Sequence, residues 1–238
     1  MPVQITAHRG ASGSAPENTL VALQKAIEAG AEYAEIDVQE TSDGKLVLLH
    51  DPDLKRTAGI KKNIWQASYD EIKHLDAGSW FSNAFRGEKI PLLEEAIELV
   101  RGKMLLNIEL KTNGYEVRLA ERVCETVKRM NFSGQAIITS FEPGQIKAVE
   151  STAPEMRTGL IFYFMPSYNV LSIQSPVLSM HKRNAGKKFI EQAREAGKEL
   201  HIWTVNEEKD MRELIQAGVD NIITNYPQQL RNILNSMT

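Results

Sequence analysis

Several short apolar runs of this chain end in side chains that could hold a cation and transfer protons. They comprise two imidazoles, three carboxylates and two cations, namely His8 and His50, then Glu35, Asp37 and Glu109, then Arg9 and Lys111. Carboxylate oxygens are ligands that suit Mg²⁺, Ca²⁺ or Mn²⁺. Imidazoles serve as general acids and bases near neutral pH. With two cations to neutralise an anion, the set suits the cleavage of a phosphate ester.

Strand geometry predicts that these side chains meet. Side chains two apart on a strand point to the same face, so Glu35 and Asp37 share one face, as do Glu109 and Lys111. Glu109 and Lys111 alone would be an ordinary salt bridge. Two acids along one inward face are harder to explain without a cation, because burying unpaired charge costs several kcal/mol. We therefore expect one divalent cation, Mg²⁺ or Ca²⁺ with Mn²⁺ as a further choice.

The elements that must position these residues alternate between short apolar runs and amphipathic segments. Strands are expected at residues 3–8, 33–38, 104–110, 136–139, 158–162, somewhere within 170–180, 199–204 and 221–224. Helices are expected at residues 19–29, 92–100, 115–130, 143–150, 185–196, 207–217 and from Pro227 onward. Pro91 is expected to open the helix at 92–100 as its first helical residue. An extra strand is expected at residues 45–49, and we interpret it as an addition to the second βα unit and not as a barrel strand of its own. Eight βα units in 238 residues predict an α/β fold, a single (β/α)8 TIM barrel spanning residues 1–238.

The barrel carries one small insertion, after the strand of the second βα unit, at about residues 52–90. Segments this long are usually functional or carry structure of their own. Ser68 followed by Glu71 predicts a capping box for a short helix through Leu75. Two interpretations remain, a self-packed excursion and a cap over the site. The start of the segment just after His50 favours the cap.

Composition excludes several classes of protein. The net charge of −3 disfavours a nucleic-acid binder, and no apolar run approaches the roughly 18 residues of a membrane span. The first residues show neither the basic nor the apolar part of an export signal, and a single cysteine, Cys124, permits no intrachain disulfide. We expect a cytoplasmic protein with no stable membrane association. Its oligomeric state is left open.

Further side chains carry weaker signals. Trp203 is a candidate aromatic wall for a small substrate, and His201 shares its strand face. Glu17 and Asn18 stand in the loop before the first helix, where they could add substrate or phosphate contacts near a helix N-terminus. His74 and His181 are expected to have no function.

At these residues the chain resembles the glycerophosphodiester phosphodiesterase family. The matching motifs are His8-Arg9-Gly10 with Pro16-Glu17-Asn18-Thr19, Glu35-Ile36-Asp37-Val38, Leu49-His50-Asp51-Pro52, Ile90-Pro91-Leu92-Leu93-Glu94-Glu95, Asn107-Ile108-Glu109-Leu110-Lys111, Trp203-Thr204-Val205-Asn206, and Gly218-Val219-Asp220 through Thr224-Asn225-Tyr226-Pro227. The likeness covers nearly the whole chain. Singly these motifs are short, whereas their order and spacing are highly specific. Asn225 departs from the pattern, because aspartate is frequent there, so it is not assigned to the metal.

The resemblance implies a metal-containing barrel that hydrolyses small glycerophosphodiesters to glycerol 3-phosphate and an alcohol. It makes Glu35, Asp37 and Glu109 metal ligands and His8 and His50 the acid–base pair. Arg9 and Lys111 would contact phosphate, and Trp203 would pack on the substrate. Two alternatives are a lysophospholipase D-type enzyme acting on lysolipids and a non-catalytic barrel that binds phosphodiesters. The preferred alcohol, the order of acid and base, and direct water attack versus a cyclic phosphate remain open.

Overall fold

A computed structural model describes residues 3–237, so Met1, Pro2 and Thr238 of the expected domain lie outside the described residues. Eight parallel strands form a closed barrel, in the order β1 (Gln4–His8), β2 (Tyr33–Glu40), β4 (Leu105–Leu110), β5 (Ala136–Ser140), β6 (Arg157–Phe162), β7 (Val177–His181), β8 (Glu199–Trp203) and β9 (Asn221–Thr224). The barrel closes because β1 pairs with both β2 and β9. The expected (β/α)8 fold class is confirmed.

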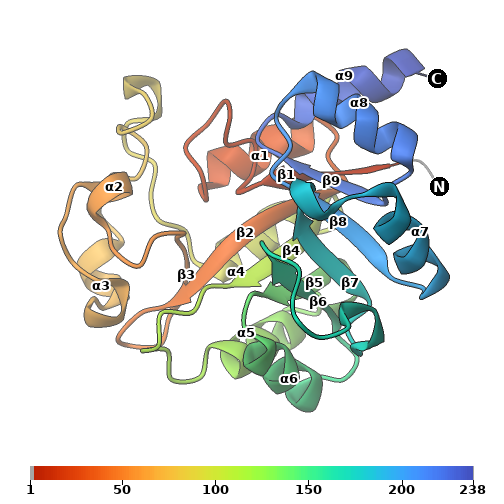
Figure 1. Cartoon of the computed structure of the whole chain (residues 1–238). Coiled ribbons are helices and arrows are strands. Elements are labelled where there is room, and N and C mark those ends of the chain that lie inside the picture. Colours follow the sequence, from red (N-terminus) through yellow and green to blue (C-terminus); the bar gives the residue numbers. More distant parts are fainter. Residues whose placement is uncertain (1–2, 238) are drawn as a thin grey trace.

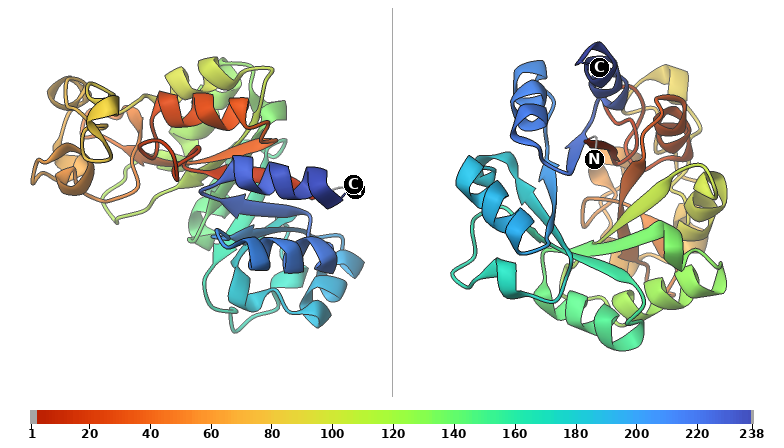
Figure 2. Two further views of the ribbon diagram at one scale, coloured as in Figure 1. Left: turned by 90° about the horizontal axis from the view of Figure 1, so that it is seen from above. Right: turned by 90° about the vertical axis from the view of Figure 1, so that its right-hand side faces the viewer.

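Helices surround the strands in a ring, as the right-hand view of Figure 2 shows. They are α1 (Leu20–Glu28), α4 (Leu93–Val100), α5 (Leu119–Arg129), α6 (Pro143–Thr152), α7 (Lys187–Glu195), α8 (Glu208–Ala217) and α9 (Pro227–Met237). The main apolar core joins strand residues such as Ile36 and Ile108 to helix residues such as Leu23 and Val123, all fully buried. Within residues 3–237, no helix has the length and apolarity that a membrane span needs.

The second βα unit carries the expected excursion and insertion. Strand β3 (Leu46–Leu48) pairs antiparallel with β2, and the insertion then holds the short helices α2 (Lys55–Ala58) and α3 (Tyr69–Ile72) and the 3-10 turns Ile64–Gln66 and Asn83–Phe85. It projects to one side of the barrel (Figure 1). A separate apolar cluster supports it, made of Val47, Leu49, Leu54, Ile64, Ala67, Ile72, Ala77 and Ile90. The insertion thus packs largely on itself.

Local predictions in this unit hold in part. The capping box of Ser68 and Glu71 is present, but its helix ends at Ile72 and not at Leu75. Pro91 was expected to be the first residue of the next helix, and this was wrong. Leu92 is the N-cap of α4, because the chain at this point still pairs with β3, where Pro91 O accepts a hydrogen bond from Leu48 N at 2.9 Å.

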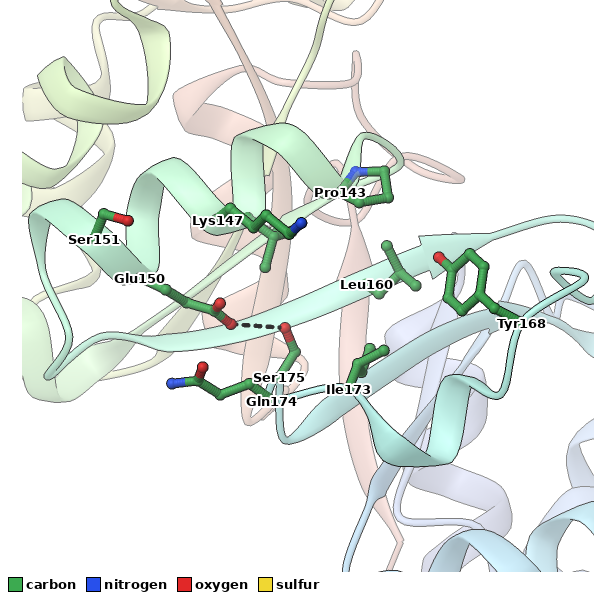
Figure 3. Close-up of a pocket in the computed structure, with 10 residues that line it drawn as sticks. Pro143, Lys147, Glu150, Ser151, Leu160, Tyr168, Ile173, Gln174 and Ser175 are labelled. Carbon is green, nitrogen blue, oxygen red and sulfur yellow. Dashed lines mark hydrogen bonds between the residues drawn. The ribbon is translucent and has the colours of Figure 1, made fainter.

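No α-helix was expected between the strand at residues 158–162 and the strand within residues 170–180, and none forms there. The connection from β6 to β7 contains only a 3-10 turn, Val170–Ser172, and β7 forms the sixth barrel strand at the end of the expected window. Pro166 and Pro176 bracket a segment without helical periodicity, which explains why no α-helix forms. Beside α6 lies a groove of about 690 Å³ whose lining includes Ile146, Leu160 and Ile173, and Figure 3 shows Leu160 and Ile173 within it. Glu150 crosses it to Ser175 Oγ at 3.1 Å.

Candidate active site

Three carboxylates from neighbouring strands form the centre of the site. Glu35 and Asp37 lie on β2 and Glu109 on β4, where Asp37 and Glu109 are register partners. One oxygen from each of the three lies within 4.8 Å of the others. All three side chains are nearly inaccessible to solvent, and Oε1 of Glu35 has no hydrogen-bond partner. Buried oxygen ligands with an unsatisfied atom fit a hard divalent cation such as Mg²⁺ or Ca²⁺.

The electrostatics of the three acids support the same interpretation. Burial, together with the charges of Asp37 and Glu109, raises the pKa of Glu35 well above its ordinary value. Burial and the charge of Asp37 raise the pKa of Glu109 to about 7. Burial also opposes the ionisation of Asp37, but Arg9 and Lys111 outweigh it and lower that pKa. Protein groups alone therefore do not neutralise the cluster, whereas a divalent cation would allow all three acids to ionise.

Two cations flank the acids. Arg9 Nε lies 3.2 Å from Asp37 Oδ2, and Lys111 Nζ lies 2.7 Å from Glu109 Oε1 and 3.6 Å from Asp37 Oδ1. Each cation retains slightly less than a fifth of its side-chain exposure. They reach the acids from the positions directly after β1 and β4.

The backbone after β1 turns sharply to place Arg9. Arg9 has a φ of 54° and Asn18 a φ of 55°, both in the left-handed region that non-glycine residues seldom adopt. In this conformation Arg9 N donates to Glu35 Oε2 at 2.9 Å, and Asn18 N donates to Arg9 O at 3.0 Å. Gly10 is required for packing, since a Cβ at this position would lie 2.6 Å from Ala22 C. Less common backbone conformations of this kind cluster at functional sites.

Both histidines are held through Nδ1. His8 Nδ1 lies 2.7 Å from Asn225 Oδ1, and His50 Nδ1 lies 2.9 Å from Asp51 Oδ1. Because an amide or carboxylate oxygen only accepts, Nδ1 carries the proton in each ring, and Nε2 is left for chemistry. Nε2 of His8 is 3.9 Å from Glu35 Oε2. Burial, reinforced by Arg9, lowers the pKa of His8 to about 4.

A cavity of about 130 Å³ connects these groups. It is lined by His8, Arg9, Glu35, His50, Asn107, Glu109, Lys111, Phe141, Ile161, Ser179, Trp203, Thr204 and Ile223. The larger groove beside α6 lies among residues that carry no such cluster of acids and imidazoles. The acids, cations and imidazoles expected in the site therefore gather at the small cavity and not at the larger groove.

The site occupies the carboxyl end of a barrel of a recognisable family. The model of the Glycerophosphoryl diester phosphodiesterase family matches residues 8–229. The chain belongs to this family. A glycerophosphodiester phosphodiesterase of Caldanaerobacter subterraneus subsp. tengcongensis is 37% identical, with 98% of each protein covered. The match confirms the family that the sequence motifs predicted.

Solved structures and a more distant relative extend the comparison. A phosphodiesterase of Oleispira antarctica, solved in complex with the product sn-glycerol-3-phosphate, is 31% identical with a TM-score of 0.92, covering 98% of this chain and 97% of that one. A human lysophospholipase D is 27% identical over 97% of this chain and 86% of that protein. The proteins similar to this chain thus include both glycerophosphodiester phosphodiesterases and a lysophospholipase D.

Glu17 and Asn18 lie in the loop before α1, as expected, and both bind other residues of the site. Asn18 is buried, its Nδ2 donates to Asp37 Oδ2 at 2.8 Å, and its Oδ1 accepts from Asp37 N at 3.1 Å. Glu17 Oε1 accepts from Arg9 Nη1 at 2.9 Å. Both residues therefore contact site residues and do not line the cavity.

The remaining histidines differ in burial and in their distance from the site. His74 is exposed in the insertion. His181 lies closer to the site than expected, with its ring centroid 5.4 Å from that of Trp203 and 4.5 Å from that of Tyr163. His201 is completely buried inside the barrel, and its Nε2 lies 2.8 Å from Glu199 Oε1 near the amino end of the strands.

Sequence reasoning missed three contributors. Asn225 was set aside as a metal ligand, and its contact with His8 was not foreseen. Asp51 was part of a motif but received no role, although its position next to His50 was a usable signal. Phe141 follows β5 directly and lines the cavity with Trp203, at a ring-centroid distance of 5.8 Å. No sequence signal distinguished this phenylalanine from the others.

Proposed function

We propose that this protein is a metal-dependent hydrolase that cleaves glycerophosphodiesters to glycerol 3-phosphate and an alcohol. One observation carries the proposal: two buried carboxylates, two cations and two oriented imidazoles line one small cavity, and the third carboxylate, Asp37, lies within 4.8 Å of the other two. The relative solved with sn-glycerol-3-phosphate supports the identity of the product. The substrate would be a small soluble diester that binds at the carboxyl end of the barrel.

Glu35, Asp37 and Glu109 would hold one divalent cation, Mg²⁺, Ca²⁺ or Mn²⁺. When bound, this ion would polarise a phosphoryl oxygen and offset negative charge in the transition state. Arg9 and Lys111 lie beside the same acids, so they would contact the remaining phosphate oxygens. Fixed positive groups of this kind stabilise developing charge without rearranging during the reaction.

The two imidazoles divide the proton transfers between them. The low pKa of His8 keeps this ring neutral at pH 7, the state of a general base that takes a proton at Nε2. His50 is held at Nδ1 by the carboxylate of Asp51, and it would donate a proton from Nε2 to the leaving alkoxide. The base would activate either water or the glycerol 2-hydroxyl.

The neighbouring side chains would position these groups. Asn18 orients Asp37 through two hydrogen bonds, and Glu17 holds Arg9. Trp203 and Phe141 form an apolar wall on which the carbon skeleton of the substrate would pack. In this arrangement Glu17 and Asn18 support the phosphate site without touching phosphate.

A lysophospholipase D-type activity is the second candidate, and exposed aromatic side chains favour it. Phe141, Tyr163 and Phe164 follow β5 and β6 and remain 42%, 37% and 71% exposed. Acyl chains would gain from contact with such surfaces. The test compares kcat/KM for glycerophosphocholine and lysophosphatidylcholine below the critical micelle concentration. We expect the soluble diester to be preferred, and a preference for the lysolipid would support the second candidate.

The direct test of the proposed reaction is product identification. Purified protein with added Mg²⁺, Ca²⁺ or Mn²⁺ should release glycerol 3-phosphate and choline from glycerophosphocholine. The His8→Ala variant, prepared identically, controls for contaminating enzymes. Release of phosphocholine and glycerol would place the cleavage on the other phosphoester bond and contradict the proposal, as would an equal rate in the variant.

A further inference from the structure

Arg56, in helix α2 of the insertion, binds two carboxylates at once. Its Nη1 and Nη2 donate to Glu17 Oε2 and Oε1, each at 2.8 Å. Its Nε and Nη2 donate to Asp51 Oδ2 and Oδ1 at 2.6 and 3.1 Å. The guanidinium also lies 5.3 Å from the ring centroid of Trp80. Because the donors of an arginine are fixed in one plane, both acids are held relative to each other and to the insertion.

One of these carboxylates controls a catalytic imidazole. Asp51 Oδ1 is 2.9 Å from His50 Nδ1. Hydrogen bonds from Arg56 are the main reason that the pKa of Asp51 falls to about 2, so this group is ionised at neutral pH. An ionised carboxylate can only accept, which requires the proton of the neutral ring to reside on Nδ1.

The other carboxylate controls the phosphate side of the site. Glu17 Oε1 accepts from Arg9 Nη1 at 2.9 Å, while Arg9 Nε faces Asp37 Oδ2 at 3.2 Å. Glu17 and Asp37 thus hold the guanidinium of Arg9 from two directions. Since Arg56 binds both oxygens of Glu17, the position of Arg9 depends on an arginine of the insertion.

We infer that Arg56 is a positioning residue that couples the folded insertion to catalysis, by holding Asp51 against His50 and Glu17 against Arg9. The catalytic consequence rests on the proposed function. The effect on the tautomer of His50 does not depend on any substrate. This role explains why a segment with its own apolar cluster begins directly after the histidine. In this role the insertion acts through Arg56, so its aromatic side chains need not contact the substrate.

Two variants and one matched control test the inference on the full chain loaded with Mg²⁺. Arg56→Met removes all four hydrogen bonds, and Arg56→Lys keeps the charge but cannot serve both carboxylates in one plane. Arg86→Met is the control, because Arg86 is an exposed arginine of the same insertion. Two-bond ¹H–¹⁵N spectra of histidine-labelled protein locate the ring proton. The His50 signals are assigned by their loss in His50→Gln, and the ring is observed in its neutral form.

The wild type and Arg86→Met should show the His50 proton on Nδ1, whereas Arg56→Met should show mixed tautomers. Its kcat for glycerophosphocholine should fall about 10- to 100-fold, as expected for misplaced catalytic groups, with a smaller change in KM. Arg56→Lys should lie between the two. An unchanged tautomer or an unchanged kcat in folded Arg56→Met overturns the inference.

Two failures of the experiment, an unfolded variant and an inactive wild type, still give an interpretable result. If Arg56→Met does not fold, Arg56→Lys alone decides by the same two criteria. If the wild type releases no glycerol 3-phosphate, the proposed function fails, and the spectra alone decide whether Arg56 sets the tautomer of His50.

Discussion

Asn225 Oδ1 lies 2.7 Å from Nδ1 of His8, at the point where the last barrel strand meets the first. The equivalent contact of His50 is with the carboxylate of Asp51, at 2.9 Å. The partner of His8 is thus a neutral amide and that of His50 a carboxylate, and burial lowers the pKa of His8 to about 4. This asymmetry is the physical basis for assigning His8 as the base and His50 as the acid.

The first prediction concerns the partner of His8. Asn225→Asp would place a negative charge beside the ring and raise the pKa of His8 from about 4. A base with a higher pKa is protonated at higher pH, so the acid limb of the kcat/KM profile should move upward in pH. Asn225→Ala should lower kcat without moving the limb in that direction. An acid limb of Asn225→Asp that coincides with that of the wild type would refute this contact as a control of His8.

The second prediction separates the roles of the two histidines. His8→Ala and His50→Ala should each reduce kcat for glycerophosphocholine by at least about 100-fold, as loss of a general acid or base does. With a p-nitrophenyl diester, whose leaving group needs no proton, His50→Ala should recover much more activity than His8→Ala. His74→Ala should remain near the wild-type rate, because this side chain is exposed in the insertion. The reverse pattern of recovery would exchange the roles of His8 and His50.

The third prediction concerns stability at the opposite end of the barrel. Burial opposes ionisation of Glu199, but His201 and Arg157 outweigh it and lower the pKa of Glu199 from 4.5 to about 2. A carboxylate with a lowered pKa in the folded state stabilises the protein above its unfolded pKa. This contribution is lost as pH falls toward 2. The wild type should therefore lose stability between about pH 5 and 2 through this group.

Chemical unfolding of Glu199→Gln at several pH values checks the sign of this effect. The variant should be less stable than the wild type at pH 7, and the difference should shrink steadily as pH falls below about 4.5. Arg212→Met, which removes an exposed ion pair with Glu208, is the control and should show little pH dependence. A difference for Glu199→Gln that stays constant from pH 7 to 3 would argue against the lowered pKa.

The central acids could be predicted from the sequence because strand alternation is local. Two acids at positions 35 and 37 of an apolar run must share a face, and parallel strands bring their carboxyl ends together. Glu109 was predicted to join them because it ends a neighbouring apolar run in the same way. The structure accordingly places one oxygen of each acid within 4.8 Å of the other two.

The residues that orient this set could not be predicted, because their contacts depend on tertiary structure. Asn225 meets His8 across 217 positions, and Arg56 meets Glu17 across 39 positions. No periodicity marks either residue, and Arg56 lies on a helix of only four residues. The sixth barrel strand could be placed only within residues 170–180, because the segment before it is apolar without a regular period.

The most direct test of the central claim is metal titration of chelated protein. Exhaustive chelation should abolish the release of glycerol 3-phosphate, and circular dichroism should remain close to that of the untreated protein, because the acids lie at the barrel mouth and not in its apolar core. Re-addition of Mg²⁺, Ca²⁺ or Mn²⁺ should restore activity at about one ion per chain. Glu35→Gln, matched in size, should fail to recover. Full activity in rigorously metal-free protein would contradict the account.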